Sequence, residues 1–149
     1  MWNRASASIS LIRNPTMDKV QAAQIGGRRV LLLDSITWVD AGDAGQVVVS
    51  GSHGGRSAGT YAVLFPLALC CLNDAGVGKD RAGIAALAML DEHDIPGVTY
   101  SHNSARIGEA RDAWEHGIIS HVNASAAALG FVVGLKLRAA IEQAFAARR

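Results

Sequence analysis

Four short apolar runs of this chain each end in a cluster of polar and small residues, and this repetition constrains the fold more than any single motif does. The runs cover residues 47–49, 68–72, 98–100 and 118–119, and the clusters that follow them cover 50–55, 73–80, 101–106 and 120–123. If the runs are parallel strands of one sheet, all four clusters lie along one edge, outside the carboxyl ends of the strands. Open α/β sheets bind their ligands at that edge. The pattern therefore predicts where a ligand binds.

Segments with helical character separate the runs. Residues 56–67 follow a glycine-rich turn, and residues 81–93 carry an apolar stripe at helical spacing behind Asp80, a favourable N-cap residue. Further helices are predicted at 105–116, 124–129 and 135–147, and one or two additional strands at 30–33 and 36–39. Because strands that alternate with helices imply right-handed crossovers, we expect a mostly parallel sheet. The predicted fold is a single-domain, three-layer α/β/α structure of the Rossmann-like or flavodoxin-like type.

The length and the charge of the chain limit its organisation and its partners. The 149 residues suffice for one core, which we assign to residues 25–149. Residues 1–24 have no sustained hydrophobic period, so they are predicted to form a flexible or partner-clasping N-terminal arm. With 14 basic and 13 acidic residues, the formal net charge of +1 provides no electrostatic footprint for nucleic acid or for an anionic membrane. Neither partner is expected.

The cysteines and the hydropathy indicate the compartment. Cys70 and Cys71 are adjacent inside an apolar run, where neither a local disulfide nor a metal site is favoured, so we interpret them as buried thiols. No apolar stretch approaches the ~20 residues that span a bilayer, and residues 6–10 are too polar for a secretory signal. We therefore expect a cytoplasmic protein.

The first polar cluster contains Ser50, Ser52 and His53, followed by Gly54 and Gly55. Glycines allow backbone N–H groups to approach an anion, and an imidazole can transfer a proton near neutral pH. We predict that His53 is catalytic and that the serines and glycines bind substrate. The alternative is a tight strand-to-helix turn, in which the glycines serve only the backbone geometry.

The second cluster shares a Gly-Lys pair with the phosphate-binding P-loop but lacks two of its requirements. Asn73 replaces the first glycine, and Asp80 replaces the hydroxyl residue that would bind magnesium, so a nucleoside triphosphatase is excluded. Asp74 ends a predicted strand and is predicted to act as a catalytic base or orienting group, the alternative being an Asx-turn. A carboxylate or a single phosphate is predicted to bind at Asn73, Gly76, Gly78 and Lys79.

The third cluster contributes an imidazole and a guanidinium group. His102 is predicted to transfer protons, and Arg106 offers the fork geometry that clamps a carboxylate through two hydrogen bonds. Ser104 is predicted either to contact the ligand or to cap the following helix. A surface pair of Arg106 with Glu109 or Asp112 is the alternative to its substrate-binding role.

The fourth cluster places His121 and Asn123 at the end of the last predicted strand, where both are predicted to bind substrate. If all four clusters share one edge, His121 joins His53 and His102 there, and three imidazoles could bind zinc. The histidines are scattered singly, without the paired spacing of typical zinc ligands. We therefore predict no metal site and no cofactor.

Together these residues predict an enzyme that acts on a small anionic molecule, a carboxylate or a monophosphate, by acid–base chemistry. His53, Asp74 and His102 would move protons in a hydrolysis, an elimination or an isomerisation. A non-catalytic metabolite-binding module is one alternative. Another is an accessory subunit that packs through Trp38 or Trp114. We expect a homo-oligomer, which is compatible with each of these functions.

Overall fold

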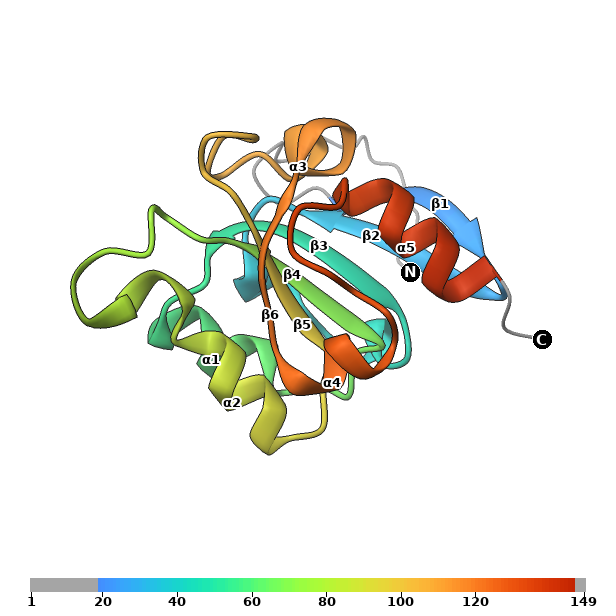
Figure 1. Cartoon of the computed structure of the whole chain (residues 1–149). Coiled ribbons are helices and arrows are strands. Elements are labelled where there is room, and N and C mark those ends of the chain that lie inside the picture. Colours follow the sequence, from blue (N-terminus) through green and yellow to red (C-terminus); the bar gives the residue numbers. More distant parts are fainter. Residues whose placement is uncertain (1–18, 147–149) are drawn as a thin grey trace, which may run out of the picture.

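The computed structural model describes residues 19–146, which form one six-stranded sheet with helices on both faces (Figure 1). The strands are β1 (Lys19–Ile25), β2 (Arg28–Leu33), β3 (Val47–His53), β4 (Leu69–Asn73), β5 (Gly97–Tyr100) and β6 (Ile119–Val122). Strands β2 to β5 are mutually parallel, whereas β1 and β6 run antiparallel to their neighbours at the two edges. The predicted α/β class is confirmed, and the sheet is mixed.

The strands lie in the sheet in the order in which they occur in the sequence. This order differs from that of doubly wound folds, in which the strand order reverses near the middle of the sheet. The connections β3–α1–β4 and β4–α2–β5 both advance in the same direction, so α1 (Arg56–Ala62) and α2 (Ala86–Glu92) cover the same face. The parallel part of the sheet therefore has no point where the strand order reverses, and the expected Rossmann-like or flavodoxin-like order is not observed.

The opposite face is covered by the part of the chain that follows β5. Helices α3 (Ala110–His116) and α5 (Leu137–Ala146) pack there, and α4 (Ala124–Ala128) follows β6 (Figure 1). The predicted helices are thus present, but each begins later or ends earlier in the structure than the sequence pattern predicts. Within residues 19–146, no helix has both the length and the apolar character needed to cross a membrane.

Three local predictions need correction. Residues 36–39 were expected to form a strand, but Ile36–Trp38 is a 3-10 helix (η2) whose first turn is capped by the Ser35 hydroxyl. A second 3-10 helix (η3, Ala41–Asp43) precedes β3. Asp80 does not cap α2, because it lies in a third 3-10 segment (η4, Lys79–Ile84) with a φ of 56°. Of the predicted arm, residues 19–24 belong to β1, and residues 1–18 lie outside the described residues.

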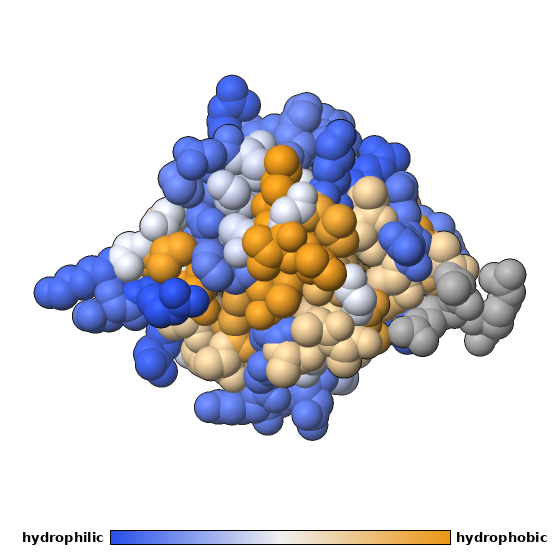
Figure 2. Space-filling view, in the orientation of Figure 1, coloured by the Kyte–Doolittle hydropathy of each residue, from blue (hydrophilic) through white to orange (hydrophobic). Residues whose placement is uncertain are grey.

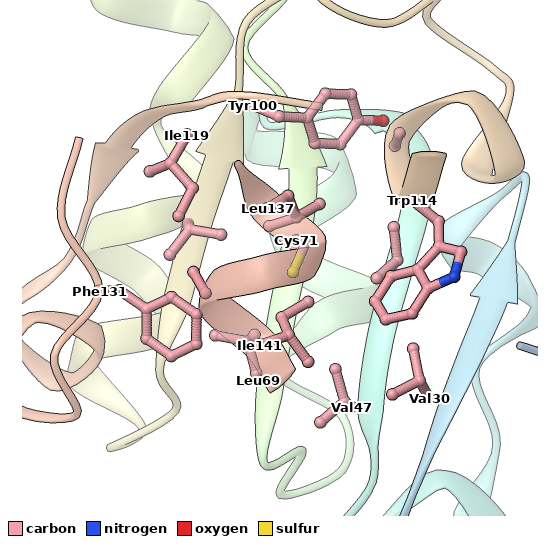
Figure 3. Packing of buried hydrophobic residues seen from close by; sticks show 14 of the residues in the cluster. Val30, Val47, Leu69, Cys71, Tyr100, Trp114, Ile119, Phe131, Leu137 and Ile141 are labelled. Carbon is pink, nitrogen blue, oxygen red and sulfur yellow. The ribbon is translucent and has the colours of Figure 1, made fainter. Parts of the chain in front are cut away.

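The side chains of the parallel strands alternate between two apolar clusters, one on each face of the sheet. In β2, Val30 faces the α3 and α5 side and Leu31 faces the α1 and α2 side. Figure 3 shows the first cluster, in which Trp114 packs among strand and α5 side chains. Trp114 is only 3% exposed, so it cannot serve as the surface contact of an accessory subunit. Cys70 and Cys71 are buried free thiols on opposite faces, as predicted.

Candidate functional site

The first three polar clusters meet at one edge of the sheet, and the fourth does not. His53 pairs with Asn73 and Asn73 pairs with Tyr100, so the carboxyl ends of β3, β4 and β5 are adjacent. Because β6 is antiparallel to β5, it begins beside Tyr100 and runs away from this edge. The expectation that residues 120–123 end at the same edge is therefore wrong.

Asn123 lies beside the amino end of β5, and its side-chain amide makes hydrogen bonds to backbone groups. Its Nδ2 donates to the carbonyl oxygens of Leu87 (3.2 Å) and Ile95 (3.0 Å). Its Oδ1 accepts from the N–H groups of Gly97 (3.0 Å) and Ala126 (2.9 Å). These four bonds join α2, β5 and α4, so the amide has a structural role.

At the shared edge, the Asp74 carboxylate holds His102. Oδ1 of Asp74 accepts from His102 N (3.1 Å), from Gly76 N (2.8 Å) and from His102 Nδ1 (3.1 Å). The Asp74 side chain is 6% exposed, whereas that of His102 is 48% exposed. An ionised carboxylate can only accept, so Nδ1 carries the proton and the lone pair of Nε2 is left without a bond to Asp74. This is the arrangement of an imidazole oriented for proton transfer.

Several hydrogen bonds keep Asp74 ionised. Burial raises the pKa of this carboxyl, but the hydrogen bonds from Gly76 N, from the Ser120 hydroxyl and from His102 outweigh the burial, and the pKa lies below the usual 3.8. At neutral pH the carboxylate is therefore charged. It can stabilise a positive charge that forms on the neighbouring imidazole during a reaction.

Ser120 extends this network to β6. Its hydroxyl lies 2.9 Å from Thr99 Oγ1 and 3.3 Å from His121 Nδ1. Thr99 is completely buried, and its hydroxyl lies 3.3 Å from His121 Nδ1 as well. A polar chain thus runs from His102 through Asp74 and Ser120 to His121. The sequence pattern missed Ser120, because only the antiparallel direction of β6 places it behind Asp74.

The loop that follows β4 has an unusual backbone conformation. Ala75, Gly76, Val77 and Gly78 have φ values between 52° and 75°. Such values are rare for a residue with a side chain, especially a β-branched one. Gly78 N donates to Gly76 O around Val77 (2.7 Å), and Gly83 N donates to Val77 O (2.7 Å). Backbone strain of this kind persists only where its surroundings hold it in place, and it is concentrated at ligand sites.

The polar side chains of the first cluster and of Asn73 make their hydrogen bonds mainly to backbone groups. This is what the alternative interpretation, a tight strand-to-helix turn, predicts for the first cluster. Ser50 Oγ accepts from Ser52 N (3.0 Å), and Ser52 Oγ accepts from Ile36 N (3.0 Å). His53 is exposed, and its Nδ1 accepts from Gly55 N (3.0 Å).

The glycines of this turn are required by close packing. A Cβ at Gly54 would lie 2.7 Å from the carbonyl oxygen of Gly83. Asn73 is fully buried, donates to Ala105 O (3.1 Å) and accepts from Ala75 N (2.8 Å). These groups shape the edge and leave His53 as the exposed imidazole of the first cluster.

A cavity of about 410 Å³ lies beside His102 and includes Arg106. Arg106 is 76% exposed, and its guanidinium lies 3.8 Å from Asp112 and 4.0 Å from Glu109. The surface pair that we gave as the alternative is therefore present, although its distances are long. Ser104 Oγ donates to Ser101 O (2.7 Å) and accepts from Ile118 N (2.9 Å), so it fastens the loop and caps no helix.

Neither a metal cluster nor a resemblance points to the function. Within residues 19–146, no three His, Cys, Asp or Glu side chains are placed to hold a metal ion. No protein family, no curated protein and no solved structure matches this chain.

Proposed function

We propose that this chain is an enzyme that acts on a small anionic molecule by acid–base catalysis, with His102 as the group that transfers the proton and Asp74 as the residue that orients it. The observation that carries the proposal is the buried, ionised carboxylate on Nδ1 of a half-exposed imidazole that lines a cavity. A carboxylate of this kind fixes the tautomer and then stabilises the imidazolium, which favours general base catalysis.

Two cationic side chains in the loops that follow β4 and β5 support an anionic substrate. Arg106 lines the same cavity, and its long ion pairs cost little to exchange for a ligand carboxylate or phosphate. Lys79 follows the strained loop, is exposed, and has no side-chain partner among residues 19–146. We infer a carboxylate or a monophosphate held by these two side chains. Hydrolysis, elimination and isomerisation are all within the reach of a single histidine base.

His53 is retained as a second proton-transfer candidate, because it is exposed at the neighbouring strand end. Its Nδ1 accepts from Gly55 N, which assigns the proton of the neutral ring to Nε2. Such a ring can donate a hydrogen bond from Nε2 to the substrate, and it can transfer a proton once Nδ1 is protonated and gives up the bond from Gly55 N. We propose that the two histidines act as an acid and a base in a cytoplasmic homo-oligomer that needs no cofactor.

The test begins with a thermal-shift screen of the purified chain against small carboxylates, sugar phosphates and other monophosphates. A ligand at 100 times its dissociation constant stabilises a fold by about 2.7 kcal/mol, which such a screen detects. Hits are then assayed for turnover with His102→Gln, and with His93→Gln as the matched control. His93 is an exposed histidine at the end of α2 whose Nδ1 contacts Met89 O.

We expect His102→Gln to bind the ligand but to turn it over about 10²- to 10⁴-fold more slowly, which is the usual contribution of a general base. The His93→Gln variant should keep the wild-type rate. Asp74→Asn should lower the rate and, as seen by ¹⁵N NMR of the imidazole, remove the preference for the Nδ1–H tautomer. Full activity of His102→Gln would refute the proposal. A ligand that binds and is never converted would favour the metabolite-binding alternative.

A further inference from the structure

Among residues 19–146, two arginines have no side-chain partner, whereas the other arginines of this part of the chain are all engaged. Seven arginines lie within residues 19–146. Those that make a hydrogen bond, an ion pair or a contact with an aromatic ring are Arg28, Arg29, Arg106, Arg111 and Arg138. The side chains of Arg56 and Arg81 make no such contact with another described residue. Both are exposed, and both line the same groove.

This groove has a volume of about 660 Å³ and lies between α2 and β6. Arg56 begins α1, Arg81 belongs to η4, and the imidazole of His121 comes from β6. Residues that are far apart in the sequence thus place cationic and polar groups around one hollow. A volume of this size matches the sites that bind small organic molecules.

The remainder of the groove is largely apolar. Its lining includes Ile84 and Leu87 from the α2 side, and Val122 and Val133 from the β6 side. Val133 is 56% exposed. Figure 2 shows apolar surface at the centre of this face, where Figure 1 draws the segment between α4 and α5 beside β6. A ligand with a hydrocarbon body would bury this surface.

Two carboxylates also line the groove, and they differ in whether hydrogen-bond donors offset their charge. Asp91 accepts hydrogen bonds from Ala124 N (2.9 Å), Ser125 N (3.0 Å) and the Ser125 hydroxyl (2.9 Å). Its charge is therefore offset by three donors. Asp80 is exposed and has no side-chain partner among residues 19–146, so it is the one acidic group that would oppose an anion there.

We infer that this groove binds an amphipathic organic anion, with a carboxylate or phosphate monoester head on Arg56 and Arg81 and an apolar body along Leu87, Val122 and Val133. Guanidinium groups recognise both heads through paired hydrogen bonds, and arginines without internal partners lose no ion pair when they bind a ligand. The inference goes beyond the proposed chemistry at His102. It concerns binding, so its outcome does not depend on any turnover.

The test uses hexyl phosphate as the probe, with inorganic phosphate and 1-hexanol as the two halves of the molecule. Binding is followed by ¹H–¹⁵N NMR, with the amide peaks of Ala85, Ala88 and Val122 as reporters of the groove. We expect hexyl phosphate to shift these peaks and to bind more tightly than either half. Equal binding of 1-hexanol, or shifts confined to other parts of the chain, would overturn the inference.

Charge substitutions test the role of the arginines. Arg56→Gln and Arg81→Gln should each weaken the binding of hexyl phosphate about tenfold, the scale of a lost charge-assisted hydrogen bond. Asp80→Asn should tighten it about twofold by removing a repulsion at an exposed site. The matched control is Arg111→Gln, because Arg111 is an exposed arginine of α3 that pairs with Glu115 outside the groove. Wild-type affinity in both arginine variants, or equal weakening in the control, would refute the site.

Discussion

Replacing Asn123 with alanine should destabilise the fold. This asparagine is only 6% exposed, and its amide makes four hydrogen bonds to backbone groups. Alanine removes all four and adds no polar group that could replace them. The backbone groups left behind belong to α2, the loop before β5, β5 itself and α4.

The magnitude follows from the number of bonds. A typical intramolecular hydrogen bond contributes about 1 kcal/mol, so the loss of four bonds predicts a decrease of about 4 kcal/mol in the free energy of unfolding. That is a large part of the roughly 5–15 kcal/mol by which a domain is usually stable. For a chain of this length, the corresponding decrease in Tm is roughly 10 °C.

Urea denaturation of the wild type and of Asn123→Ala measures this difference directly. Asn103→Ala is the matched control, because Asn103 is exposed and its side chain makes no hydrogen bond within residues 19–146. The control should lie within about 0.5 kcal/mol of the wild type. A loss below about 1 kcal/mol for Asn123→Ala would refute the structural role, and a selective loss of ligand affinity would restore its predicted role in binding substrate.

Four further outcomes can be checked on the same protein. The pKa of Asp74 lies below 3.8, so its charge contributes stability that is present above about pH 4 and is lost as the pH falls through the folded-state pKa. Below about pH 4, the difference in the free energy of unfolding between the wild type and Asp74→Asn, measured by urea denaturation, should therefore narrow. Gly83→Ala should destabilise by at least about 2 kcal/mol in the same assay, because its Cβ would collide with the carbonyl oxygen of Asp74. Asp94→Gly should raise the stability by about 0.5–1 kcal/mol, since Asp94 is an exposed residue with a φ of 58° at the end of α2. Burial raises the pKa of the Cys70 thiol to about 12, so iodoacetamide at pH 8 should alkylate it only after unfolding, as mass spectrometry would show.

The parallel strands could be predicted because their signal is local. Strands buried on both faces appear as continuous apolar runs, and residues 30–33, 47–49 and 69–72 have that pattern and form β2, β3 and β4. The direction of β6 has no such signal. Residues 101–118 are long enough for a parallel crossover, yet Ile119 pairs antiparallel with Tyr100. Contacts that are distant in the sequence decide that direction.

The sequence contains a signal for strand β1, namely the glycine pair that follows it. Gly26 and Gly27 separate β1 from β2, and both have positive φ values, of 57° and 84°. A Gly-Gly pair between two strands is a typical two-residue hairpin turn. The segment before the turn, KVQAAQI, is only partly buried and has a weak hydrophobic pattern, so its sequence does not distinguish it from the predicted arm. The salt bridge from Lys19 to the buried Asp43 (2.8 Å) helps to hold this edge strand.

For the site, the sequence identified residue types but not their contacts. Asp74 and His102 follow different strands, and their hydrogen bond depends on the register of β4 against β5. The serines and glycines of the first cluster look the same in a ligand-binding loop and in a tight turn, and here their described contacts are with the backbone. Arg56 and Arg81 attracted no prediction, because a lone arginine is distinguished only by the absence of a partner in the folded chain.

The strand order explains why neither the cavity beside His102 nor the groove beside His121 lies at a point where the strand order reverses. In a doubly wound sheet, loops diverge where the strand order reverses, and the crevice between them binds the ligand. Here all three parallel connections, β2–β3, β3–β4 and β4–β5, pass over the same face, so the carboxyl edge has no such crevice. The chain instead leaves a cavity beside His102 and a groove beside His121. Asp74 is connected to both through its hydrogen bonds to His102 and Ser120, so a change at this carboxylate should affect the two hollows together.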